Sequence, residues 1–153
     1  KKDNNAVYDI GCLGKISDYQ KSRDGRILIN LTGISRFKIL KEIPGKKLYR
    51  EFKVDYHNFS SDTEGDQNEV NIDDLMEKAK TFFKRNGLLL NWREFDKLDC
   101  IQKINTMSMI APITNEEKQK ILEAVSIENK IEVLENIISF YLYDTGLNNQ
   151  TIQ

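Results

Sequence analysis

Residues able to do chemistry are few in this chain, and they are spread apart. A metal site needs several His, Cys or carboxylate ligands within reach of one another. His57 is the single histidine, and the two cysteines, Cys12 and Cys100, are distant in sequence. A nucleophilic serine needs a positioned base and a glycine elbow, and neither pattern occurs. We therefore predict no catalytic residue and no metal ligand.

Nucleotide chemistry is not encoded either. A phosphate-binding loop needs clustered glycines whose amides face the anion, often beside a lysine. The eight glycines are instead scattered at positions typical of turns. Carboxylates are plentiful, but helix capping and exposure to solvent explain them without a role in acid-base catalysis. The sequence therefore predicts a chain that neither hydrolyses ATP nor cleaves proteins, and that uses no cofactor.

Amino-acid composition limits the binding partners and the cellular compartment that are expected for this chain. The 153 residues fit one domain with a real core. With 23 Lys and Arg against 24 Asp and Glu the net charge is -1, so bulk attraction to nucleic acid is not expected. The apolar runs fall far short of the ~20 residues of a membrane span. Two cysteines without paired spacing favour a reduced, cytoplasmic location.

The first half of the chain, from Tyr8 to Phe59, has the two-residue periodicity of β-strands. Turn signals lie at residues 22–25 and 44–45, and Gly33 interrupts the alternation. Four strands are therefore expected, around residues 8–16, 27–32, 37–43 and 48–56. Strands in this order form a meander or part of a small barrel. Residues 60–69 have no apolar side chain, so a surface linker is expected over 60–70.

Helical patterns fill the second half, over residues 71–145, and residues 146–153 are expected to form a tail. Asn71 is suited to cap a helix that ends at Asn86-Gly87. Asn91 then caps a short turn, and a further helix runs from about Asp99 to Ile110.

Two capped amphipathic helices follow with almost no loop between them. Thr114 and Glu117 fit a capping box, and Ser126 offers a second cap. Each helix has one apolar face, which must be buried against the preceding helices. The residues of these faces are Ile121, Leu122 and Val125, and then Ile127, Ile131, Leu134, Ile138 and Leu142.

Several segments resemble one known family. The run from 88 to 140, which begins LLLNWREFDKLDC and ends IEVLENIISF, resembles the C-terminal half of bacterial stand-alone LON-domain proteins. These correspond to the N-terminal substrate-binding domain of ATP-dependent Lon protease. The segments GCLGKI (11–16), DGRILINLTG (24–33) and SRFKI (35–39) resemble the family's strand, hairpin and Gly-x-x-Arg-Phe segments. The family's opening strand and helix have no counterpart, so either the chain is truncated at its start or these elements are absent from it.

This resemblance implies an α+β fold. Residues 1–59 are expected to form a PUA-like β barrel, incomplete at its N-terminal side, and an α-helical bundle follows it. It also implies a non-catalytic module that binds unfolded or partner polypeptide in proteolysis or protein quality control. An RNA-binding module is the alternative, because PUA-like barrels elsewhere bind RNA. A contiguous basic face would favour RNA, and an exposed apolar groove would favour polypeptide.

Four residues are candidates for the site. Tyr49, Phe52 and Trp92 are aromatic side chains that could line a groove offered by the β part and the start of the helical part. The alternative is a purely structural role: Tyr49 and Phe52 would belong to an ordinary strand, and Trp92 would anchor the core. Arg36 matches the Arg of the family's Gly-x-x-Arg-Phe segment, where it either braces a turn or holds an anion.

Overall fold

The computed structural model describes residues 6–64 and 70–147. The chain divides into two compact units, residues 1–67 (the β unit) and residues 68–153 (the helical unit). Strands and helices are therefore separated along the chain, as the α+β prediction requires. None of the helices in the described part of the chain is long and apolar enough to cross a membrane.

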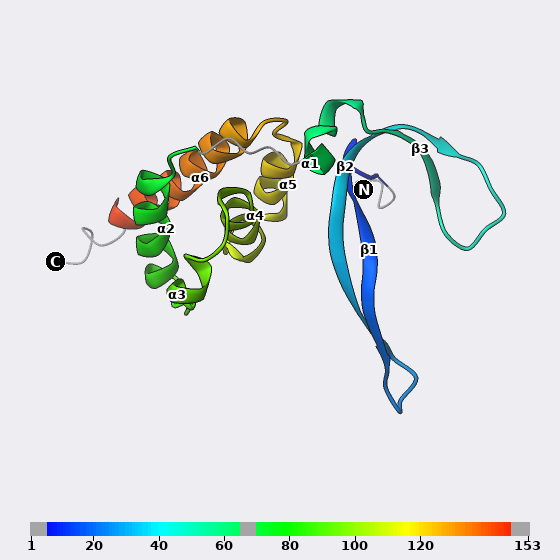
Figure 1. Ribbon diagram of the computed structural model, residues 1–153, viewed down its shortest axis with the longest axis horizontal. Coiled ribbons are helices and arrows are strands. Elements are labelled where there is room, and N and C mark those ends of the chain that lie inside the picture. Colours follow the sequence, from blue (N-terminus) through cyan, green and yellow to red (C-terminus); the bar gives the residue numbers. More distant parts are fainter. Residues whose placement is uncertain (1–5, 65–69, 148–153) are drawn as a thin grey trace. The chain divides into compact units, whose positions relative to one another are not determined.

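An antiparallel three-stranded sheet of order β1-β2-β3 forms the β unit (Figure 1). Its strands are β1 (Ile10–Lys21), β2 (Ile27–Ile43) and β3 (Glu51–Asp55). The sheet is open, because within the described residues β1 and β3 each pair with β2 alone. The predicted turn between β1 and β2 is confirmed: Gly25 adopts φ +85°, and the amide of Ser22 donates to the carbonyl of Arg26.

Gly33 does not end a strand, and the prediction of four strands is wrong. The segments expected at 27–32 and 37–43 form the single 17-residue strand β2. Leu13 pairs with Ser35 and Gly14 pairs with Gly33, which leaves Ile34 as an extra residue on β2. This is a β-bulge, a feature that glycine in a strand often marks. The periodicity breaks there because the ladder shifts by one residue and then continues.

The last strand is also shorter than expected. It was predicted over residues 48–56, but β3 begins at Glu51, which pairs with Ile43 at the end of β2. Pro44 follows Ile43 directly and has no N–H to donate, so the ladder stops there. Leu48 and Tyr49 consequently lie in the β2–β3 connection and are exposed.

Part of the predicted linker is helical. After the 3-10 turn η1 (His57–Phe59), residues Ser61–Glu64 form one helical turn, α1. Thr63 stabilises this turn, because its amide and its hydroxyl both donate to the carbonyl of Ser60, at 3.1 and 3.0 Å. Arg36 of β2 also forms hydrogen bonds with Asp62 of α1. The amino-acid composition of a linker does not predict such a contact. Residues 65–69 of the linker and 148–153 of the tail lie outside the described residues.

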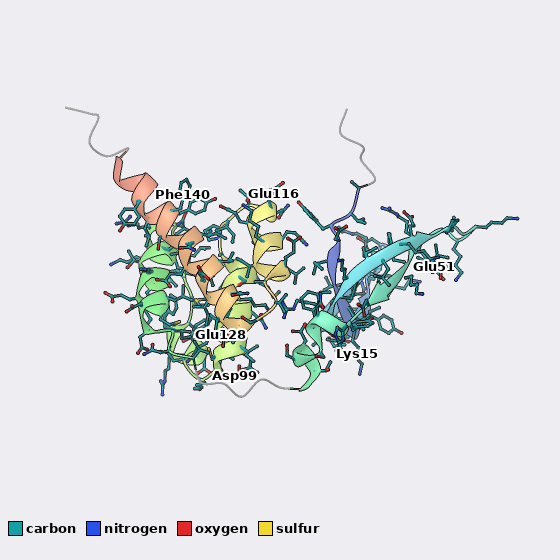
Figure 2. The ribbon with its side chains drawn as sticks, turned by 90° about the horizontal axis from the view of Figure 1, so that it is seen from above. Lys15, Glu51, Asp99, Glu116, Glu128 and Phe140 are labelled. Carbon is teal, nitrogen blue, oxygen red and sulfur yellow. The ribbon has the colours of Figure 1, made fainter. Side chains whose placement is uncertain are left out.

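The helical unit contains α2 (Asp73–Arg85), α3 (Trp92–Phe95), α4 (Cys100–Ile110), α5 (Asn115–Glu123) and α6 (Ile127–Leu147). The long helix α6 packs against α2, α4 and α5. Figure 2 shows Glu128 and Phe140 along α6, and Glu116 on α5. The fully buried side chains of the core are Leu75, Ala79, Phe82, Phe83, Ile104, Met107, Ala111, Leu134 and Ile138.

Burial confirms most of the predicted apolar faces. Ile121, Leu134 and Ile138 are buried, but Val125 is about half exposed. Because α5 ends at Glu123, Val125 lies in the link to α6, where helical spacing no longer decides which way a side chain points.

The predicted caps hold in detail at α5 and α6. Thr114 and Glu117 form both bonds of the capping box, and the amide of Asn129 donates to the Ser126 hydroxyl at 3.2 Å. The cap of α2 differs by one position. Ile72 occupies the cap site, while the Asn71 side chain accepts a bond from the amide of Asp73 at 2.8 Å.

Glu117 makes the helical unit sensitive to acid. Its Oε2 accepts bonds from the Thr114 amide at 2.8 Å, the Thr114 hydroxyl at 3.0 Å and the Tyr141 hydroxyl at 2.9 Å. Burial raises the pKa of this carboxyl, but the bonds from Thr114 and Tyr141 outweigh burial and hold the pKa below its usual range. The ionised form therefore stabilises the fold above the unfolded pKa of about 4.3, and this stabilisation disappears as pH falls through the folded pKa.

We therefore expect Glu117→Gln to lower the free energy of unfolding near neutral pH, and the difference from the unaltered chain to shrink below about pH 4.3. Denaturant unfolding of both proteins across this pH range measures the difference. Tyr141→Phe removes one of the bonds and should show a smaller pH-dependent difference. A difference that grows on acidification would contradict the prediction.

Candidate functional site

Arg36 holds the last elements of the β unit against β2. It is 5% exposed, and its Nε and Nη2 donate to the two carboxylate oxygens of Asp62 at 2.9 and 2.7 Å. The Arg36 amide donates to the same carboxylate at 2.9 Å. The Phe59 ring lies 4.5 Å from the guanidinium, so the cation is covered on its flat face as well. The guanidinium thus ties α1 and η1 to the sheet.

A shallow pocket of about 390 Å³ lies next to Ser35 and Ser60, close to the Arg36–Asp62 pair. Leu13, Ile34 and Tyr56 supply its apolar walls, and the Tyr56 ring is held edge-on by Phe37 at 6.0 Å. The bulge in β2 supplies Ile34, so the register shift and the pocket have the same origin. The remaining lining residues are Ser35, His57, Ser60 and Thr63.

A stripe of apolar side chains covers one face of the β1–β2 hairpin. Ile16 lies opposite Leu31 and Tyr19 lies opposite Ile29, and alternation along β2 places Ile27 on the same face. We call these five residues the hairpin stripe. All are exposed, from 44% for Ile29 to 70% for Tyr19. A contiguous exposed apolar patch is unusual in a monomeric protein and marks an interaction surface.

The edge of β1 lies next to this stripe. Because β2 is the central strand, the outer backbone groups of β1 pair with no other strand of the described sheet. Unpaired strand edges are templates for an added strand. The hairpin therefore offers both backbone hydrogen-bonding groups and apolar side chains to an extended chain.

The candidate aromatic residues belong to different parts of the structure. Tyr49 is exposed in the β2–β3 connection, and Phe52 is half-buried in β3 with the Arg50 guanidinium 5.0 Å from its ring. Trp92 belongs to the helical unit, where its ring contacts Phe83 and Phe95 with centroids 6.0 and 5.5 Å apart. Trp92 therefore contributes to the packing of the helical core.

Sequence reasoning missed both the hairpin stripe and the pocket. The alternation of Ile27, Ile29 and Leu31 was visible, but alternation predicts a strand and does not reveal whether its apolar face is covered. The pocket combines residues 13 and 63, which are distant in sequence. Within the described ranges, no group of three or more His, Cys, Asp or Glu residues is placed to hold a metal ion.

A small antiparallel sheet with an exposed apolar face, followed along the chain by a helical bundle, defines the class of this protein as an α+β module. Residues 1–139 match the family model described as the ATP-dependent protease La (LON) substrate-binding domain. The chain belongs to this family, which confirms the resemblance seen in its sequence.

Curated relatives of the chain are Lon proteases. It is 26% identical over 144 residues to the Lon protease of Brevibacillus choshinensis, covering 90% of this chain and 18% of that protein. It is 29% identical over 147 residues to the Lon protease of Malacoplasma penetrans (strain HF-2), covering 89% and 18%. The chain thus spans about one fifth of the length of these relatives.

Solved structures support the fold. The Lon N-terminal domain protein of Xanthomonas campestris matches with a TM-score of 0.58 at 12% identity, covering 86% of this chain and 69% of that one. The N-terminal domain of the Mycobacterium avium complex Lon protease matches with a TM-score of 0.57 at 17% identity, covering 88% and 72%. The predicted α+β fold is therefore confirmed.

Proposed function

We propose that the β unit is a non-catalytic module that binds extended, apolar segments of polypeptide. The hairpin stripe carries this proposal, because it exposes five large apolar side chains on one sheet face. Covering apolar surface is favourable by about 25 cal/mol per Å². The family's description as a substrate-binding domain of a protease supports a polypeptide as the ligand.

Strand addition is the mode of binding that the hairpin favours. An extended segment pairs its backbone with the outer edge of β1, and its alternate side chains point to the face that carries the stripe. Main-chain bonds supply affinity for many sequences, while the apolar contacts select segments that a folded protein would bury. The pocket beside Ile34 provides a further apolar contact in the same unit.

A reduced compartment fits this role. Cys12 and Cys100 are both free thiols, and Cys12 is exposed. We place the module in the cytoplasm, where exposed thiols persist in the reduced form.

We expect the purified chain to bind labelled peptides from unfolded proteins with micromolar affinity, about -8 kcal/mol or weaker. Raising the ionic strength should leave this affinity nearly unchanged, because apolar contacts are not screened by salt. The variant Ile29→Ser/Leu31→Ser should bind about tenfold more weakly, since it removes two apolar contacts. Fluorescence anisotropy at two salt concentrations measures these affinities.

Leu28→Ser is the control, because Leu28 is at least as exposed as Ile29 and Leu31 but lies on the opposite face of β2. It should bind like the unaltered chain. Equal affinities for all three proteins would contradict the proposed surface. Salt-sensitive binding of a mixed RNA pool with no peptide binding would replace the proposal by the RNA-binding alternative. Turnover of ATP or casein that persists through further purification would contradict a non-catalytic role.

A further inference from the structure

Three lysines gather where β2 pairs with β3. Lys41 lies directly opposite Lys53, and Lys38 lies opposite Asp55. Residues 53 and 55 share a face of β3, so all four side chains lie on one face of the sheet. We call Lys38, Lys41 and Lys53 the basic face. Like charges opposite each other in an antiparallel pair are destabilising, so the Lys41–Lys53 pair costs the ladder stability.

Nearby acidic groups compensate this charge only in part. None of the three lysines forms an ion pair with a residue of the described ranges. Glu51 is paired with Lys47 at 2.7 Å, and Glu42 is paired with Arg50 at 2.7 Å. Asp55 faces the lysines, and its Oδ1 accepts a bond from the His57 amide at 3.1 Å. Three cations therefore share this face with one carboxylate that is not in an ion pair.

Apolar side chains border the basic face. Leu40 is the extra residue of a second irregularity in β2, and it is 52% exposed. Ile43 is exposed as well and lies opposite Glu51. A ligand that suits this surface therefore combines negative charge with apolar groups, which describes an acidic polypeptide segment better than a nucleic acid backbone.

The strand β2 connects the basic face to the hairpin stripe. Leu31 belongs to the stripe and Lys41 to the basic face, and both lie in the one continuous strand. At about 3.3 Å per residue, the ten steps between them span roughly 33 Å. Arg36 lies between them and is covered by Asp62 and Phe59, so the ligand cannot run straight along β2. A ligand paired with the outer edge of β1 runs beside this stretch, because Ile16 pairs with Leu31 and Ile10 pairs with Lys38, and it can turn toward the basic face where β1 ends. One polypeptide segment of about ten residues or more can therefore reach both surfaces.

We propose that the basic face binds carboxylate side chains of the polypeptide, so that the preferred ligands carry an apolar stretch and, about ten residues away, Asp or Glu. This inference rests on the proposed polypeptide binding and adds to it a preference for acidic segments. Opposite charges at this exposed site attract modestly and are screened by salt.

The experiment uses the full chain and three peptides of equal length. They share an apolar stretch and differ only in a pair of Glu, Gln or Lys residues about ten positions away. We expect the Glu peptide to bind about five- to tenfold more tightly than the Gln peptide at low salt, and this advantage to shrink at high salt. The variant Lys41→Glu/Lys53→Glu should instead prefer the Lys peptide.

Two further variants make the test specific. Lys84→Glu/Lys120→Glu changes the net charge equally but lies in α2 and α5 of the helical unit and leaves the basic face and the hairpin stripe intact, so it should keep the preference for Glu. Lys41→Glu alone replaces the like-charge pair by an opposite pair, which favours the ladder. It should fold at least as well as the unaltered chain and lose the preference, and circular dichroism checks its folding.

The outcomes separate the two proposals. If all three peptides bind equally well, the acidic preference is wrong and polypeptide binding stands. If no peptide binds, the proposed function itself is wrong. If the double variant aggregates while peptide preference is unchanged, the lysines only protect the β3 edge from pairing with other chains, and the inference is overturned. Loss of RNA binding in this variant, with no effect on peptides, would assign the basic face to nucleic acid.

Discussion

Replacing Leu134 by Ala is expected to lower the free energy of unfolding of the helical unit by about 2–5 kcal/mol. Leu134 is 0% exposed and lies in α6, which packs against three other helices. The truncation removes buried methyl groups and leaves a cavity that the surrounding helices only partly fill. Chemical denaturation followed by the fluorescence of Trp92, which packs against the same core, measures the loss.

Phe140→Ala is the matched control on the same helix. Phe140, which is labelled on α6 in Figure 2, is 63% exposed. Its truncation should therefore change the free energy of unfolding by about 0.5 kcal/mol or less. A change for Leu134→Ala as small as that of the control would show that this face of α6 is not a filled core.

Breaking the Arg36–Asp62 pair is expected to have the second large effect, on the β unit. Asp62→Ala leaves a guanidinium that is only 6% exposed without its main partner, and an uncompensated buried charge costs about 3–5 kcal/mol. Because the Asp62 side chain is 18% exposed, water can partly replace it, and we expect about 3 kcal/mol. The variant should lose α1 first, since this pair ties α1 to β2.

Native-state hydrogen exchange of the amides in the β1–β2 and β2–β3 ladders measures the loss of stability of the β unit. The Arg36 amide, which donates to Asp62 at 2.9 Å, should in addition lose its own protection. Glu42→Ala is the control in the same unit: it breaks the Glu42–Arg50 pair, whose side chains are 47% and 42% exposed, and should cost less than about 1 kcal/mol. Equal losses in the two variants would show that Arg36 is better hydrated than its burial indicates.

The two proposals divide the surface of the β unit between apolar and charged contacts. We propose that the hairpin stripe recognises the apolar side chains that unfolded segments expose and that the basic face selects among those segments by charge. Binding that depends on apolar contacts resists salt, whereas the charge preference disappears as salt rises. Measuring each peptide at two ionic strengths therefore separates the two contributions within a single experiment.

The sequence by itself determined the features that depend on near neighbours. The capping box of Thr114 and Glu117 joins residues three positions apart, and the turn around Gly25 closes within five residues. Such contacts do not depend on the tertiary structure, because both partners are close in sequence. For the same reason, the helices of the second half were predicted with nearly correct limits. The family resemblance was also visible in the sequence.

Only the tertiary structure decided which surfaces are covered and which distant residues meet. Arg36 and Asp62 are 26 positions apart, so their pairing depends on how α1 returns to β2. The bulge at Ile34 depends on the register of two strands. A strand was expected to end near this position, but Ile34 instead lies within β2 and lines the pocket. The exposure of the hairpin stripe likewise depends on which elements pack nearby. Alternation along a strand shows which side chains share a face, whereas burial depends on what lies above that face.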